Sequence, residues 1–75
     1  MPPKLPVVMP KKAIKAFSKV GWHVARRKGS HVHLVKPGEK AILTIPYHKK
    51  PLKRGVLRTL IKKAGLTIEE FVELL

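Results

Sequence analysis

The chain has 75 residues and carries 17 lysines and arginines against 4 acidic residues, a net charge of +13 with neutral histidines. A chain of this length builds one small domain with a thin core, and the lack of cysteine excludes disulfides and thiolate metal sites. Three of the acids lie in the last nine residues, so residues 1–66 hold all 17 cations and one acid, a density that predicts a nucleic acid as the partner.

Residues 1–10 form a proline-rich segment with the sequence MPPKLPVVMP. Its apolar stretch is too short for a signal peptide and is interrupted by proline. No apolar run elsewhere approaches the length that spans a membrane. We therefore expect a flexible arm over residues 1–10, a single domain over residues 11–75, and a cytoplasmic protein that does not bind membranes.

A first helix is predicted over residues 10–20. Proline suits the first turn of a helix, and Gly21 suits the position just after its last turn. Apolar residues recur at helical spacing along one side, and the lysines fall largely elsewhere. The buried stripe is expected to contain Ala13, Ile14, Phe17 and Val20.

Three strands are predicted next, because apolar and polar residues alternate there or β-forming residues gather between turn signals. The strands are expected over residues 22–27, 30–35 and 41–45. On the first strand, Trp22 and Val24 are expected to point inward.

A long helix is predicted over residues 52–64, and Thr67 with Glu70 forms a capping box that opens a short last helix. The stripe of the long helix is expected to contain Val56, Leu57, Leu60, Ile61 and Ala64. The order α-β-β-β-α-α predicts an α+β fold with a small three-stranded antiparallel sheet and helices on one face. This element order is similar to that of the double-stranded RNA-binding domain.

His31 follows a glycine turn and three consecutive cations, Arg26–Lys28. Side chains alternate along a strand, so Val32 and Leu34 should both face the helices. His31 and His33 should therefore share the opposite, open face of the sheet. A histidine moves protons near neutral pH, and here it would do so beside groups that bind phosphate.

The residue opposite His31 depends on the turn between the first two strands. We favour a three-residue turn, Lys28–Ser30, which makes Arg27 the cross-strand neighbour of His31. A two-residue turn, Lys28–Gly29, would instead pair Arg26 with His31. Either turn predicts an arginine beside His31.

RNA carries its own nucleophile, the 2′-hydroxyl, so a positioned general base or acid can promote its cleavage without a metal ion. DNA hydrolysis relies on metal ions held by several carboxylates, and residues 1–66 offer only Glu39. His31 and His33 alone provide too few ligands for a metal site. Cleavage of RNA without metal or cofactor is one hypothesis for these residues, with His31 as the candidate catalytic residue. The alternative is a histidine that only contacts phosphate or solvent.

Gly29, which permits a tight turn, Ser30 and His33 are the candidate supporting residues around His31. RNA could be held by phosphate contacts and stacking at the cations before the turn and at the basic loop after the third strand. These candidate RNA-binding residues are Arg26, Arg27, Lys28, Tyr47, His48, Lys49, Lys50 and Lys53. An ordinary strand-to-helix connection is the alternative for the loop.

The chain also contains a series of motifs that share an order and spacing with a known family. They are Gly21-Trp22, Arg27–His31, Pro46 with His48, Leu52–Arg58, Ile61–Leu66 and Thr67–Phe71. Over about residues 11–75 they resemble the HicA toxins, small mRNA interferases of toxin–antitoxin pairs. No single motif is specific for this family, but the order and spacing of the whole series are.

This resemblance implies a fold similar to the double-stranded RNA-binding domain, ribosome-independent cleavage of mRNA, and a HicB-type antitoxin that covers the active face. The active histidine of the family follows Gly-Ser, which corresponds to His31 here. The chain departs from the pattern at Val56, where the family often has threonine, and in its longer proline-rich arm.

Other functions stay open on the residues alone. A non-catalytic RNA-binding module with the same fold would grip RNA by its shape and backbone and leave it intact. A DNA-associated protein would use a second helix whose exposed residues are mostly lysine, which favours nonspecific contact. Membrane-surface binding fits poorly, because the apolar faces of the helices are needed for the core.

Overall fold

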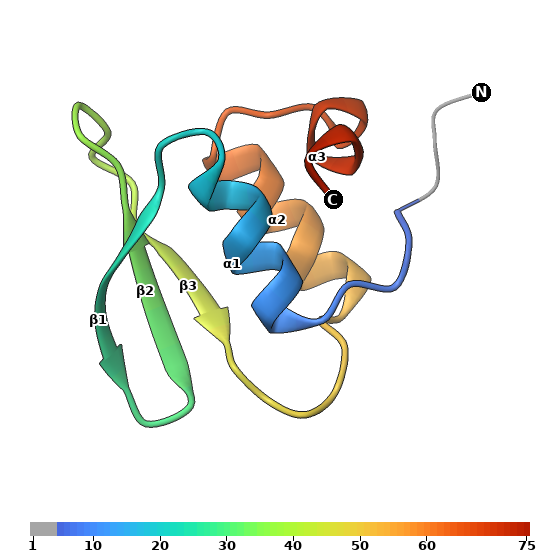
Figure 1. Cartoon of the computed structure of the whole chain (residues 1–75), viewed down its shortest axis with the longest axis horizontal. Helices are drawn as coiled ribbons and strands as arrows, with labels where there is room; N and C mark the ends of the chain where they lie inside the picture. The colour runs from blue at the N-terminus through green and yellow to red at the C-terminus, as the bar shows by residue number, and fades with distance from the viewer. Residues whose placement is uncertain (1–4) are drawn as a thin grey trace.

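The computed structural model describes residues 5–75 (Figure 1). Its elements are α1 Pro10–Ser18, β1 His23–Lys28, β2 His31–Val35, β3 Leu43–Pro46, α2 Arg54–Lys63 and α3 Ile68–Leu74. The strands form one antiparallel sheet in the order β1-β2-β3. Figure 1 shows the helices packed on one side of this sheet, so the predicted α+β fold class and element order are confirmed.

The core lies between the helices and the inner face of the sheet. Ala13 and Phe17 of the predicted stripe of α1 are buried, as are Val32 and Leu34 of β2. In α2 the buried side chains are Leu57, Leu60 and Ile61. Val56, which was expected in that stripe, is exposed at the surface.

The last helix, α3, closes the core at the end of the chain. Its first turn has the predicted capping box: the Thr67 backbone N–H donates to Glu70 Oε1 at 3.0 Å, and the Glu70 backbone N–H donates to Thr67 Oγ1 at 3.1 Å. Phe71 is fully buried, and its ring centroid lies 5.1 Å from that of Phe17. The contact joins α3 to α1.

Strand β1 departs from simple alternation. Its register against β2 shifts between Val24 and Arg26, so Ala25 forms a β-bulge. An extra residue in one strand reverses the faces of the residues that follow. Val24 pairs with the buried Leu34, yet it is half exposed because β1 is an edge strand.

The turn between β1 and β2 also differs from both expectations. Lys28 pairs with His31, which leaves Gly29 and Ser30 as a two-residue turn. Gly29 has φ +58° and no other residue of the turn has positive φ, the pattern of a type II′ hairpin turn. The prediction of an arginine opposite His31 was therefore wrong. The two-residue Gly29-Ser30 turn brings a lysine there instead.

Residues 5–9 pack along the domain ahead of α1, and residues 1–4 of the predicted arm lie outside the described residues. Leu5 and Val8 are buried, and the Leu52 backbone N–H donates to the Val8 carbonyl at 2.9 Å. This segment therefore lies beside the connection between β3 and α2. The flexibility of the arm in solution stays a prediction. Among residues 5–75, no helix is both long and apolar enough to span a membrane.

Candidate active site

His31 is the first residue of β2, and its side chain is exposed. It pairs with Lys28 on β1 and with Pro46 on β3. Residues that pair across strands present their side chains on the same face. Because the next residue, Val32, is buried against the helices, His31 and Lys28 lie together on the open face. The predicted position of His31 is confirmed, and an anion bound by Lys28 would lie beside its imidazole.

His33 lies two residues further along the same face and is half-buried. Its Nδ1 lies 3.1 Å from Thr44 Oγ1, a hydrogen bond between paired residues of β2 and β3. Arg26 pairs with it from β1. The open face thus carries two parallel pairs of a histidine and a cation, His31 with Lys28 and His33 with Arg26.

Arg27 belongs to the other face, because it pairs with the buried Val32. Its guanidinium carbon lies 4.7 Å from the centroid of the Tyr47 ring, within the range of a cation–π contact. The structure therefore separates Arg27 from His31 and joins it to Tyr47. This contact was not predicted, because Arg27 was expected opposite His31 on the open face.

Tyr47 connects the loop after β3 to the turn beside His31. The Tyr47 backbone N–H donates to the Ser30 carbonyl, and Pro46 pairs with His31. The end of β3 is consequently fixed to the same end of the sheet as the candidate catalytic histidine. The cations and histidine that follow are exposed: His48, Lys49, Lys50 and Lys53, the last being the N-cap of α2.

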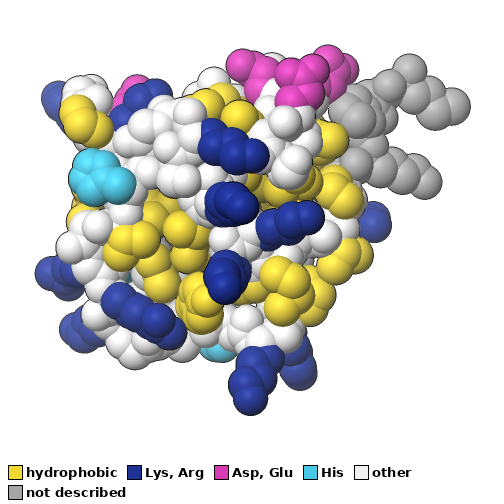
Figure 2. Space-filling view, in the orientation of Figure 1, with side chains coloured by type: hydrophobic (Ala, Val, Ile, Leu, Met, Phe, Trp, Pro, Cys, Tyr) yellow, Lys and Arg dark blue, Asp and Glu magenta, His cyan; other side chains and the backbone are white. Residues whose placement is uncertain are grey.

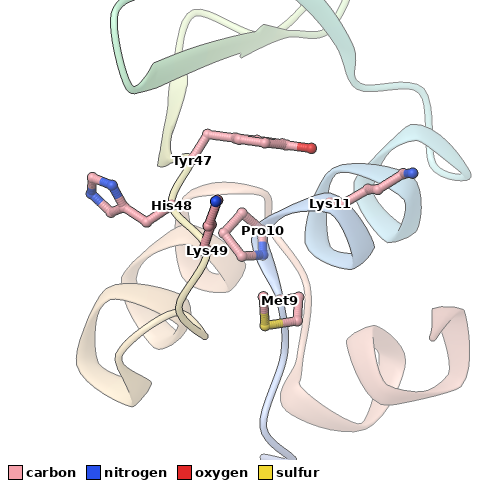
Figure 3. A pocket seen from close by; sticks show the side chains of 6 residues that line it. All are labelled: Met9, Pro10, Lys11, Tyr47, His48 and Lys49. Atoms are coloured by element: carbon pink, nitrogen blue, oxygen red, sulfur yellow. The ribbon is translucent and has the colours of Figure 1, made fainter.

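A hollow of about 360 Å³ lies between this loop and the start of α1 (Figure 3). Its lining consists of Met9, Pro10, Lys11, Tyr47, His48 and Lys49. The sequence pointed to the loop residues as a binding surface but gave no sign of the N-terminal ones. Residues 9–11 and 47–49 are far apart in the chain, and only the packing of the segment before α1 brings them together.

Charge is divided unequally over the molecule. Figure 2 shows the acidic side chains gathered mainly at the end where α3 lies, while lysines and arginines spread over the remainder of that view. The acids of α3 are Glu69, Glu70 and Glu73. Within residues 5–75 no group of three or more histidine and carboxylate side chains is arranged to hold a metal ion.

A family profile and a solved structure match this chain. The profile described as HicA toxin of bacterial toxin–antitoxin matches residues 10–66. A solved structure described as a toxin–antitoxin complex from Streptococcus pneumoniae is similar in fold, with a TM-score of 0.68 and 34% sequence identity. The match covers 81% of this chain and 100% of the chain in that structure. None of the curated proteins matches the sequence.

Proposed function

Because this chain belongs to the HicA toxin family of bacterial toxin–antitoxin systems, we propose that it is a toxin that cleaves mRNA. In this proposal the reaction needs no metal ion, and His31 acts as its general base or general acid. The observation that carries the proposal is the exposed imidazole of His31 on the open face, directly opposite Lys28. One side chain that can move a proton thus lies beside one that can hold a phosphate.

The chemistry follows from the substrate. A general base removes the proton of a ribose 2′-hydroxyl, and the oxygen attacks the adjacent phosphorus. The bond to the 5′-oxygen breaks, and that oxygen takes a proton from a general acid. The products are a 2′,3′-cyclic phosphate and a 5′-hydroxyl. Lys28 stabilises the extra negative charge on the phosphate oxygens as it develops. His33, water or the RNA itself supplies the second proton transfer, while Gly29 and Ser30 hold the turn.

The remaining cations bind the RNA backbone. Arg26 and Lys28 bind the RNA on the open face. The side chains around the end of β3 extend the basic surface toward α2. The latter are Arg27, Tyr47, His48, Lys49, Lys50 and Lys53. Phosphate contacts of this kind position the strand without reading its sequence and weaken with salt.

A HicB-type antitoxin is the proposed protein partner. The similar structure from Streptococcus pneumoniae is described as a toxin–antitoxin complex, which supports a partner of this class. An acidic antitoxin would be attracted to the basic surface and would inhibit by covering the open face. With mRNA as the substrate, the site of action is the cytoplasm.

The test compares four proteins on a defined single-stranded RNA in EDTA: wild type, His31→Ala, His33→Ala and His23→Ala. His23 pairs with Val35 at the far end of β1, so its variant is the matched control. We expect wild type and His23→Ala to produce cyclic-phosphate and 5′-hydroxyl ends, and His31→Ala to bind RNA without cutting it. Equal cleavage by His31→Ala contradicts the role of His31. Intact RNA with all four proteins indicates the non-catalytic binding module instead.

A further inference from the structure

We propose that the hollow formed by Met9–Lys11 and Tyr47–Lys49 is a pocket for one unpaired nucleobase of the RNA strand, stacked on the ring of Tyr47. We call it the base pocket. The inference rests on the proposed function and deepens it, because a pocket that takes a single base requires a single-stranded substrate. The cations at its rim, Lys11 and Lys49, would hold the phosphates on either side of that base.

The Tyr47 ring is half-buried and lines the base pocket. Figure 3 shows the ring edge-on, with Met9, Pro10 and Lys49 on one side of its plane and the strands on the other. The guanidinium carbon of Arg27, from β1, lies 4.7 Å from the ring centroid, and Arg27 is not among the residues that line the base pocket. A guanidinium on one face holds the ring in place and leaves the other face for a stacked base. Bases stack on aromatic side chains in this way in proteins that bind single strands.

The lining matches a nucleotide in chemistry and in size. Met9 and Pro10 contribute apolar side chains to the lining, and Lys11 and Lys49 contribute positively charged ones. A nucleotide likewise combines a flat, largely apolar base with an anionic phosphate. The volume of about 360 Å³ is at the small end for ligand pockets, enough for one base and far too small for a duplex.

The base pocket lies next to the candidate catalytic residue along the chain path. Tyr47 follows Pro46, which pairs with His31, and the Tyr47 backbone N–H donates to the Ser30 carbonyl. Pro46 shares the open face with His31, whereas Tyr47 presents its ring on the other face, toward Arg27. An RNA strand whose base stacks on Tyr47 would continue around this end of the sheet to the open face. A neighbouring phosphate of the same strand would then lie at His31.

The segment before α1 builds one wall of the base pocket. The carbonyl of Val8 accepts the Leu52 backbone N–H at 2.9 Å, and the side chain of Val8 is buried. These contacts fix the residue that follows, Met9, which is itself partly exposed. The family profile matches from residue 10 onward, so Met9 is outside the matched region. Pro10 and Lys11, which complete this wall, lie inside the matched region.

The chain contains one tyrosine, so fluorotyrosine incorporated biosynthetically reports on residue 47 alone. We expect adenosine monophosphate to shift its ¹⁹F NMR signal in a saturable way, both in the otherwise wild-type protein and in the His31→Ala variant. Inorganic pyrophosphate, which carries charge but no base, should leave the signal in place. An equal shift with pyrophosphate would show that the loop binds phosphate only, and would overturn the proposal.

Binding of a short single-stranded RNA to the His31→Ala protein provides the second measurement. We expect Tyr47→Ala to weaken this binding about 5- to 150-fold and Tyr47→Phe to preserve it, because stacking needs the ring and not the hydroxyl. Met9→Ala should weaken it less, and Lys40→Gln, in the turn at the opposite end of the sheet, should leave it within twofold of the parent. Unchanged affinity in Tyr47→Ala would overturn the proposal.

An RNA with a single abasic residue repeats the test without altering the protein. Scanned along the strand, the abasic residue should weaken binding at one position. Uniform affinity at every position would rule out a pocket for a single base.

Cleavage assays distinguish the base pocket from the proposed nuclease activity. If the RNA stays intact while the ¹⁹F signal shifts, the nuclease is rejected and the base pocket is supported. If the RNA is cleaved and the signal does not shift, the nuclease is supported and the base pocket is rejected.

Discussion

Lys28 and His31 face each other across the two-residue turn that joins β1 and β2, on the side of the sheet that the helices leave open. The two-residue turn Gly29-Ser30 sets this pairing, and the next pair, Arg27 with the buried Val32, lies on the opposite face. In the proposed reaction the two side chains reach the same phosphate from adjacent strands. Lys28 provides a positive charge, and His31 can donate or accept a proton.

Lys28→Gln should lower the rate of RNA cleavage about 10- to 100-fold, because the site loses the charge that stabilises the transition state. Arg27→Gln should weaken RNA binding and leave the rate at saturating protein nearly unchanged, since Arg27 is directed to Tyr47. Single-turnover kinetics separate the two effects. A larger rate loss in Arg27→Gln than in Lys28→Gln would contradict the assignment.

Gly29→Ala should lower the free energy of unfolding by about 1–2 kcal/mol, because residue 29 has a positive φ that side chains disfavour. Gly55 provides the matched control. It lies in α2, has no positive φ and has no atom within 4 Å of an added Cβ. Gly55→Ala should stabilise the protein by about 0.5–1 kcal/mol. Urea denaturation measures both, and equal effects would argue against the type II′ turn.

Phe71→Ala should destabilise the domain by about 3–5 kcal/mol, because it removes a fully buried ring that packs on Phe17. For a small domain this is a large part of the total stability. The exposed Glu73→Gln in the same helix should change stability by less than about 0.5 kcal/mol. Thermal unfolding followed by circular dichroism checks the pair. A native-like melting temperature for Phe71→Ala would mean that α3 does not complete the core.

RNA binding should weaken with salt, and the slope of log K against log [salt] should fall by about 0.7 for each phosphate contact removed from a single strand. Lys49→Gln and Lys50→Gln should each show this change. Lys40→Gln should not, since that side chain lies at the far end of the sheet. Fluorescence anisotropy at several salt concentrations gives the slopes. The same slope in all three variants would place the RNA elsewhere.

The fold and the position of His31 could be predicted because they depend on local patterns. The period of the apolar residues defined α1, β2 and α2, the capping box defined the start of α3, and the burial of Val32 placed its neighbour His31 on the open face. Alternation is local, so a single strand suffices to assign its faces. The catalytic role of His31 stays a proposal.

The residues around His31 could not be predicted to the same degree. Ala25 carries no signal for a bulge, yet one extra residue exchanges the faces of Arg26, Arg27 and Lys28. The base pocket joins Met9 to Tyr47, and their separation along the chain leaves no pattern in the sequence. Both features arise from tertiary packing.

The role of His31 in catalysis is decided by the single-turnover rate of RNA cleavage by His31→Ala, measured in EDTA and with protein in excess over RNA. Saturating protein removes differences in affinity, so the rate reports on the chemical step. We predict a loss of at least about 100-fold relative to wild type, with RNA affinity within a few-fold of it, because a general acid or base contributes about 10²- to 10⁴-fold. Cleavage at the wild-type rate by His31→Ala would contradict the account.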